Sequence, residues 1–188
     1  MRIFTVDPEI SVELYTQQQA RELFWMVDSN RRHLREWLPW IDNVDSPASM
    51  EFLIPQWTRQ FQENNGFCAG IRYHSRLAGT ISLNQIDWVN SQTSVGYYLF
   101  QQAQGRGIMT RTVSALLTNV FNHLGLNRVE IRCGEGNRKS QAIPEKLGFK
   151  KEGLIRDGEF LHNTYHNLII YGMLKREWRQ STPIFNNS

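Results

Sequence analysis

The chain has 188 residues, of which 40% are hydrophobic and 21% are charged, which is typical of one globular domain with its own core. Its formal net charge of +3 permits a small anionic ligand, but so weak a basic surplus does not predict nucleic-acid binding. The sequence shows no signal peptide and no apolar run of membrane-spanning length, so we expect a cytoplasmic protein that does not enter a membrane.

The first third of the chain predicts one strand and three helices. Residues 10–15 alternate apolar and polar side chains, as in a strand with one buried face. A capping box at 16–19 opens the first helix, and a short second helix is expected at 30–36. A Ser-Pro pair opens the third helix, which should span 46–64. Four apolar residues of the third helix are expected to face the core: Phe52, Leu53, Trp57 and Phe61.

The middle of the chain predicts a meander followed by a crossover. Strands are expected at 67–73, 78–86 and 92–100, and their short connections should make them antiparallel. The segment 109–124 has apolar residues at helical spacing, which predicts one core-facing stripe. The strand at 128–133 follows this helix and should therefore lie parallel to the strand that precedes it.

The last third predicts a short helix and a hairpin. Residues 137–147 have helical character, but Pro144 lacks an N–H group, so this helix should be short or kinked. Strands at 150–157 and 164–175 are expected to pair around a loop at 158–163.

Together these elements predict a single α/β domain over residues 1–178. The central sheet should be mixed and mostly antiparallel, with helices on both faces. Residues 179–188 are expected to form a flexible tail. Cys68 and Cys133 stand apart and are expected to be reduced, and the scattered His residues give no metal-ligand pattern, so no metal is expected.

The most informative motif is a glycine-rich turn between a predicted strand and a predicted helix, Gln102-Ala-Gln-Gly105-Arg-Gly107. Unpaired N–H groups and the helix dipole favour an anion there, and glycine lets a phosphate approach the backbone closely. The motif is not a P-loop, because it lacks the Lys-Ser/Thr pair. It is not a dinucleotide fingerprint either, because Thr110 occupies the place of the third glycine.

The form Gln-x-x-Gly-x-Gly resembles the pyrophosphate signature of the GNAT acetyltransferase superfamily. Other segments are similar to its ribosomal-protein N-acetyltransferase branch, the RimJ/RimL-like enzymes, over roughly residues 8 to 178. These segments are Arg32 to Trp40 with its Leu-Pro turn, Gly79-Thr-Ile-Ser-Leu, Gly96-Tyr97, Asn137-Arg-Lys-Ser140, Leu147-Gly-Phe-Lys-Lys-Glu-Gly153 and the closing Glu177-Trp178. The resemblance implies a GNAT fold with two splayed strands.

The resemblance also implies a binding site for acetyl-coenzyme A (acetyl-CoA). The pyrophosphate would meet the turn and the first residues of the helix: Gln104, Gly105, Arg106, Gly107, Ile108 and Met109. The amide-rich pantetheine arm would lie beside Gly96, Tyr97 and Leu99, where a strand N–H would polarise the thioester carbonyl. Asn137 would bind the same arm, and its side chain could also serve as a helix N-cap.

Two residues are implied as catalytic groups. Ser140 would assist the leaving thiolate, and Glu159 would accept a proton from the amine through water. Helix-start hydrogen bonding is an equally good role for Ser140, Glu159 could be an exposed loop carboxylate, and Glu135 is a lesser candidate base. Many relatives use a tyrosine of the helix at 137–147 as the acid, but this chain has no tyrosine there. Asn167 stands where many relatives have Asp, and if that Asp contacts the acceptor amine, recognition of the amine would be weaker or altered here.

We expect the acceptor to be the N-terminal α-amine of a protein, such as a ribosomal protein. An α-amine has a pKa near ~7.7–8.0 against ~10.4 for a lysine-type amine, so it is easier to deprotonate. Small amines (a polyamine, an amino sugar or an amino acid) are the alternative, and a non-catalytic CoA sensor is another. Trp37, Trp40 and Trp88 could line a peptide groove, or serve in the core or in homo-oligomer contacts.

Overall fold

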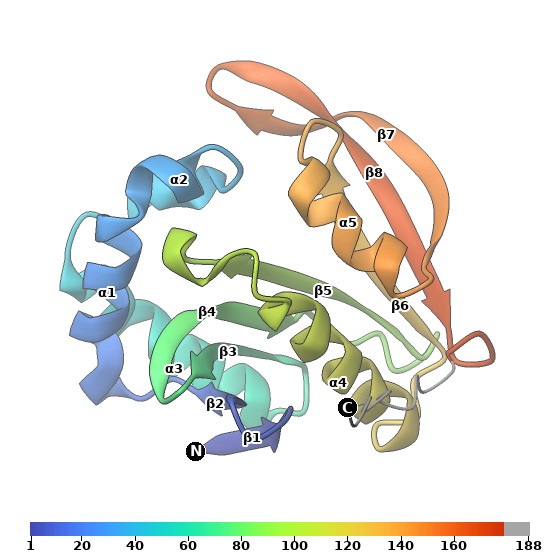
Figure 1. The fold of residues 1–188 in the computed structure, drawn as a ribbon, viewed down its shortest axis with the longest axis horizontal. Coiled ribbons are helices and arrows are strands. Elements are labelled where there is room, and N and C mark those ends of the chain that lie inside the picture. Colours follow the sequence, from blue (N-terminus) through green and yellow to red (C-terminus); the bar gives the residue numbers. More distant parts are fainter. Residues whose placement is uncertain (179–188) are drawn as a thin grey trace, which may run out of the picture.

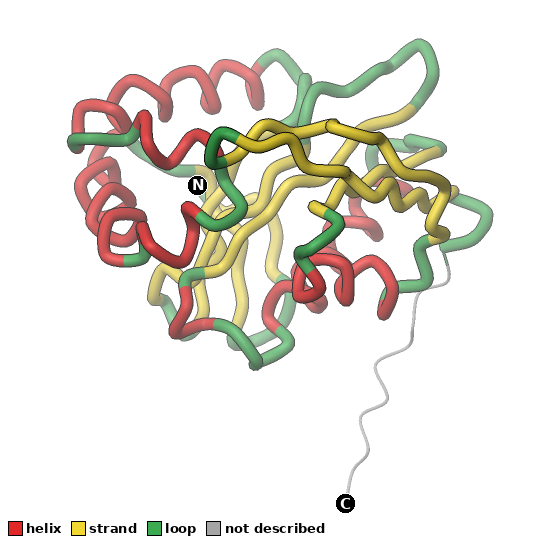
Figure 2. Tube along the Cα trace, turned by 90° about the horizontal axis from the view of Figure 1, so that it is seen from above, coloured by secondary structure: helices red, strands yellow, loops and turns green. Residues whose placement is uncertain are grey.

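The fold comes from a computed structural model that describes residues 1–178. The tail expected at 179–188 lies outside the described residues. An eight-stranded sheet in the order β1-β2-β3-β4-β5-β6-β8-β7 forms the centre of the described part (Figure 1). Helices lie on both sides of the strands, as Figure 2 shows. The predicted mixed, mostly antiparallel sheet is confirmed.

The elements have the following bounds. The strands are β1 Arg2–Thr5, β2 Ile10–Leu14, β3 Phe67–Tyr73, β4 Arg76–Leu83, β5 Gln92–Leu99, β6 Arg128–Gly134, β7 Lys150–Leu161 and β8 Thr164–Leu174. The α-helices are α1 Ala20–Ser29, α2 Arg31–Arg35, α3 Pro47–Gln62, α4 Ile108–Asn122 and α5 Arg138–Lys146. Short 3-10 turns lie at η1 Gln17–Gln19, η2 Pro39–Asn43 and η3 Gln101–Ala103.

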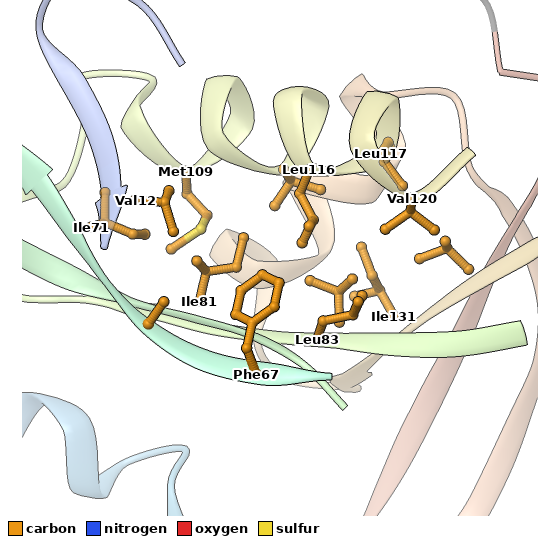
Figure 3. Packing of buried hydrophobic residues seen from close by; sticks show 14 of the residues in the cluster. Val12, Phe67, Ile71, Ile81, Leu83, Met109, Leu116, Leu117, Val120 and Ile131 are labelled. Atoms are coloured by element: carbon orange, nitrogen blue, oxygen red, sulfur yellow. The ribbon is translucent and has the colours of Figure 1, made fainter. Parts of the chain in front are cut away.

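The two faces of the sheet carry separate hydrophobic clusters. On one face, α4 packs its apolar stripe against the strands, with Leu116, Leu117 and Val120 lying over Ile81 and Ile131 (Figure 3). On the other face, α1 and α3 cover β3, β4 and β5 through a second cluster of buried apolar residues. The helical periodicity of residues 109–124 therefore predicted the core-facing stripe of α4 correctly.

One prediction for α3 is wrong. Phe52 is 72% exposed, and Met50 and Ile54 make the fully buried contacts of this helix instead. Leu53 and Trp57 are partly buried at the edge of the second cluster. The buried stripe is therefore rotated toward Met50 and Ile54, because α3 packs against α1 on one side and β3 on the other.

The terminal hairpin also differs from its prediction. β7 continues to Leu161, and the connection to β8 is only His162–Asn163, so Gly158 and Glu159 lie in a strand and not in a loop. A bulge between Ile155 and Glu159 absorbs the extra residues, with Asp157 in the left-handed region at φ 52°. Strand β1, at the opposite edge, was not predicted.

The parallel pair β5–β6 is confirmed, but it is short. Gln92, Thr93 and Ser94 pair with residues 128–130 of β6, and no ladder continues beyond this point in the described structure. Both strands go on for several residues, to Leu99 and Gly134, and they diverge as they do so (Figure 1). The implied splay therefore divides the sheet into β1–β5 and β6–β8.

No helix within the described part is both long and apolar enough to cross a membrane. Residues 1–178 also hold no cluster of three or more His, Cys, Asp or Glu side chains that could bind a metal ion. Cys68 and Cys133 are free thiols.

Candidate active site

The turn between β5 and α4 has the geometry of an anion site. Gly105 and Gly107 adopt φ values of +76° and +68°, which side chains rarely allow, and a Cβ added to either would meet nothing within 4 Å. The backbone there is thus open on its outer side. Helix α4 begins at Ile108, so the N–H groups of its first turn and its dipole face the same space. A pyrophosphate lying against the backbone fits this arrangement.

His33 and Lys139, which the sequence analysis did not indicate, both contact Gln104 at this turn. Gln104 Oε1 accepts a hydrogen bond from Lys139 Nζ at 3.2 Å, and Gln104 Nε2 lies 2.7 Å from His33 Nε2. The amide thus joins α2 and α5 across the turn, and Lys139 brings a positive charge beside it. Arg106 lies over the ring of Tyr73, with 6.0 Å between the guanidinium carbon and the ring centroid. His33 and Lys139 stand far from the turn in sequence, so only the fold could reveal them.

The backbone of β5 presents hydrogen-bonding groups to the splay. The N–H of Asn84 donates to the carbonyl of Ser94 at 2.9 Å, and the N–H of Phe100 donates to the carbonyl of Ala78 at 3.0 Å. Since backbone groups alternate sides along a strand, residues 94, 96, 98 and 100 face β4. Tyr97 and Leu99 therefore direct their N–H and C=O groups to the side that β6 has left. Amide groups of a pantetheine arm could pair with them.

Gly96 has a different position from the other two predicted strand residues. Its carbonyl accepts a hydrogen bond from Ser82 Oγ at 3.3 Å, so its backbone faces β4. A Cβ at this position would come within 2.8 Å of Ser82 Oγ. The glycine therefore permits close approach of Ser82 on the face opposite α4.

The N-terminus of α5 holds Asn137 and Ser140 together. Asn137 Oδ1 accepts a hydrogen bond from the N–H of Ser140 at 3.0 Å, so the N-cap role of Asn137 is what the structure shows. Ser140 Oγ lies 3.2 Å from the sulfur of Cys133 on β6. Burial raises the pKa of the Cys133 thiol, which keeps it protonated beside Ser140.

Glu159 lies apart from Ser140. It stands on β7 opposite His166, and no hydrogen bond among the described residues joins it to Ser140. Burial raises the pKa of the Glu159 carboxyl, and the proximity of His166 offsets this only in part. A raised pKa makes the carboxylate a better proton acceptor. The structure thus places the two predicted catalytic residues on separate elements of the β6–β8 half.

Glu135 and Asn167 form a network of their own. Asn167 Nδ2 donates to Glu135 Oε2 at 2.8 Å, and Asn167 Oδ1 accepts from the N–H of Asp157 at 3.0 Å. The amide needs its donor for the carboxylate and its acceptor for the bulge, which an Asp could not provide in ionised form. Asn167 therefore stabilises the bulge that precedes Glu159. Glu135 already accepts a hydrogen bond from Asn167.

A cavity of about 710 Å³ opens on the face of the sheet covered by α3. The residues that line it are Leu38, Trp40, Asn43, Val44, Ser49, Phe52, Leu53, Trp57, Gln60, Phe67, Cys68, Thr80, Ser82, Asn84, Gly96, Tyr97 and Tyr98. None of these side chains carries a formal charge. The cavity thus reaches β5 at residues 96–98, and of these three residues Tyr97 directs its backbone N–H and C=O groups to the splay.

Aromatic rings and neutral hydrogen-bonding groups dominate the cavity. Trp40 and Tyr98 lie with ring centroids 5.7 Å apart. Burial raises the pKa of the Tyr98 hydroxyl far above its usual range, so it stays neutral. Of the three tryptophans suggested for a peptide groove, only Trp40 is here. The Trp37 ring packs over Gly134 and Gly136, and Trp88 Nε1 donates to the carbonyl of Asn64.

Known proteins are similar to this chain in sequence and in fold. The "Putative ribosomal N-acetyltransferase YdaF" of Bacillus subtilis is 38% identical over 174 residues, which are 92% of this chain and 95% of YdaF. A crystal structure of RimL, a ribosomal L7/L12 α-N-protein acetyltransferase in complex with coenzyme A, superposes with a TM-score of 0.88 at 25% identity and covers 93% of this chain and 98% of RimL.

A third protein is similar at the level of both sequence and fold. The microcin C7 self-immunity acetyltransferase MccE, solved in complex with acetyl-CoA and AMP, gives a TM-score of 0.85 at 27% identity, over 90% of this chain and 94% of that one. The model of the acetyltransferase (GNAT) domain family matches residues 11–150. The chain therefore belongs to the GNAT family of N-acetyltransferases, which use acetyl-CoA as the acetyl donor.

Proposed function

We propose that this enzyme acetylates the N-terminal α-amine of a protein, with a ribosomal protein as the first candidate. The observation that carries the proposal is the uncharged lining of the cavity beside β5. YdaF and RimL support it, since both are named for acetylation of ribosomal proteins.

The cavity distinguishes between classes of amine. A polyamine or aminoglycoside carries several positive charges, and each would lose hydration in the cavity without meeting a carboxylate. A peptide N-terminus brings one amine together with amide groups, which Asn43, Asn84 and Ser82 can meet with neutral hydrogen bonds. Trp40 and Tyr98 can pack against an apolar side chain of the peptide. The lining therefore favours the peptide.

Acid–base chemistry points the same way. The acceptor must be neutral to attack, and an α-amine is about 2.5 pKa units easier to deprotonate than a lysine-type amine, which corresponds to about 3.4 kcal/mol. No acid of the described residues lines the cavity, and Glu159, the proposed base, is not among its lining residues, so a site of this kind suits the easier deprotonation. The α-amine is the better match to this limited base strength.

The residues of the chain divide the reaction between them. Acetyl-CoA supplies an activated acetyl group, whose C–S bond breaks as the new C–N bond to the amine forms. The N–H groups of Tyr97 and Leu99 face the splay, where one can stabilise negative charge on the carbonyl oxygen. Glu159 takes the proton that the amine loses, through water, and Ser140 stabilises the leaving sulfur or gives it a proton.

The test is release of free thiol from acetyl-CoA with three sets of acceptors. The first set consists of N-terminal peptides of ribosomal proteins. The second consists of the same peptides with a blocked N-terminus and a free lysine. The third consists of two small amines, spermidine and kanamycin, tested separately. We expect turnover with the first set only, and mass spectrometry should place the acetyl group on the α-amine. Turnover confined to spermidine or kanamycin, or equal turnover with the blocked peptides, contradicts the proposal.

A second candidate acceptor is a small amine linked to an aromatic heterocycle. The cavity offers the Trp40 and Tyr98 rings for stacking and the Asn43 and Asn84 amides for hydrogen bonds to a base edge. MccE, which was solved with AMP, supports this candidate. AMP that competes with the peptide acceptor but not with acetyl-CoA would favour it.

A further inference from the structure

The hydroxyl of Tyr97 connects β5 to the first turn of α5. Tyr97 Oη donates a hydrogen bond to the backbone carbonyl of Ser140 at 3.1 Å. Strand β5 borders one side of the splay, and α5 follows β6 on the other side, as Figure 1 shows. This hydrogen bond therefore crosses between the two halves of the sheet beyond the point where their ladder has ended.

The carbonyl of Ser140 needs this partner because of Pro144. In a regular helix the N–H of residue 144 would donate to the carbonyl of residue 140, but proline has no N–H. Ser140 is half-buried, and a carbonyl that is shielded from water and has no partner is unfavourable. Burial raises the pKa of Tyr97 well above its usual range, so the hydroxyl keeps its proton for this bond. Tyr97 thus supplies the donor that Pro144 lacks.

The bond to Tyr97 completes the fixation of Ser140 from three directions. Its N–H donates to Asn137, its Oγ contacts the sulfur of Cys133, and its carbonyl accepts from Tyr97. The partners come from the turn before α5, from β6 and from β5. Since the backbone N–H of Tyr97 faces the splay, one residue carries both a candidate donor for the thioester carbonyl and the group that orients Ser140.

We propose that Tyr97 is a positioning residue for acetyl transfer: its hydroxyl, made necessary by Pro144, fixes Ser140 relative to the N–H donors of β5. Tyr97 acts through Ser140 and does not exchange a proton with the substrates. The inference rests on the role proposed above for Ser140 and is independent of the identity of the acceptor.

The first experiment uses Tyr97→Phe, with hydroxylamine as a small acceptor so that the acceptor cavity plays no part. We expect kcat for thiol release to fall about tenfold or more, as for loss of a buried hydrogen bond felt in the transition state, while the KM for acetyl-CoA changes less than about threefold. Hydrogen exchange at residues 138–141 should become faster, and this second measurement needs no turnover. Unchanged kcat with unchanged exchange overturns the inference.

The matched control is Tyr171→Phe. Tyr171 Oη on β8 donates to Glu145 Oε1 at 2.8 Å, so this variant also removes a tyrosine hydrogen bond between the sheet and α5, but at the far end of the helix from Ser140. It should lower the melting temperature and leave kcat unchanged. An equal loss of kcat in both variants would mean that stability of α5 is all that matters, which contradicts the inference.

A double variant separates the two roles of the hydrogen bond, which are to satisfy the Ser140 carbonyl and to connect α5 to β5. In Tyr97→Phe/Pro144→Ala, the new N–H at 144 can satisfy the carbonyl of Ser140 within the helix. We expect the melting temperature to recover while kcat stays low, because the connection to β5 is still missing. Recovery of kcat together with stability overturns the inference. Full activity in Ser140→Ala would instead contradict the role proposed for Ser140, and the exchange rates at residues 138–141 would still decide whether Tyr97 fixes this turn.

Discussion

At the scale of single residues, Glu159 is the proposed base, and its environment bears on that proposal. Its side chain is withdrawn from full solvation on β7, and its pKa is raised. A raised pKa means that the carboxylate form is lost at a higher pH than for an ordinary glutamate as the pH falls. The acid limb of the rate profile should therefore lie above about pH 4.3, the ordinary glutamate value.

Glu159→Gln tests this base role. We expect kcat to fall about 10²- to 10⁴-fold, the usual contribution of a positioned general base, and the acid limb of the pH profile to disappear. Steady-state kinetics from pH 4 to 9 would measure both effects. If Glu135→Gln caused the larger loss and Glu159→Gln kept its acid limb, Glu135 would be the base instead.

The side-chain amide of Asn167 connects the Glu135 carboxylate to the backbone N–H of Asp157 in the β7 bulge. In Asn167→Asp, two carboxylates would meet at hydrogen-bonding distance and repel each other once both are ionised. The melting temperature of the variant should therefore match the parent near pH 4 and fall below it as the pH rises to 7. Asn167→Ser, which adds no charge, should show a deficit that does not depend on pH. A deficit for Asp that shrinks with rising pH would contradict this explanation.

At the scale of elements, the turn before α4 depends on backbone conformation more than on packing. Gly107 is in the left-handed region with open space around it, so Gly107→Ala should cost roughly 1–2 kcal/mol through strain alone. This corresponds to a decrease of about 2–4 °C in melting temperature per kcal/mol. CoA affinity, measured by calorimetry, should fall as well.

A matched glycine controls for the added methyl group. A Cβ added to Gly153 on β7 would also meet nothing within 4 Å, but the φ of Gly153 is not in the left-handed region. Gly153→Ala should leave both the melting temperature and CoA affinity near their original values. Equal losses in the two variants would show that strain at the turn is not the cause.

Elements with a strong local signal were predictable from sequence. The periodicity of α4, the glycine turn and the β3–β5 meander all depend on neighbouring residues, and all three were found, although β4 spans Arg76–Leu83 and not 78–86. The extension of β7 was not predictable, because the Asp157 bulge depends on Asn167 in another strand. Phe52 was misplaced because the helical pattern does not state which of two adjacent stripes meets β3.

The residues of the candidate site divide in the same way, into those that a local motif predicts and those that only the fold brings together. The glycine turn and Asn137 could be located from short motifs, since each depends on a few adjacent residues. His33, Lys139 and the cavity lining come from segments far apart in the chain, and no single pattern connects them. The role of Tyr97 required the position of Pro144 and the fold together.

At the scale of the whole molecule, the two halves of the sheet share a ladder of only three residue pairs. If CoA supplies the missing partner, its binding should slow hydrogen exchange at the amides of Tyr97 and Leu99. The amides of Gly96 and Tyr98 already face β4 and should change little. Exchange followed by NMR with and without CoA would measure this alternation. Equal protection at all four positions would contradict the assigned strand orientation.

The splay also has a consequence for how the chain behaves before it binds its donor. An open sheet has two edge strands, here β1 and β7. Because β5 and β6 diverge, the ends of these two central strands also lack a paired neighbour on one side. Unpaired strand borders are templates on which other chains can add. If the amide-rich pantetheine arm pairs with these strands, self-association of the enzyme should be weaker with CoA bound than without it.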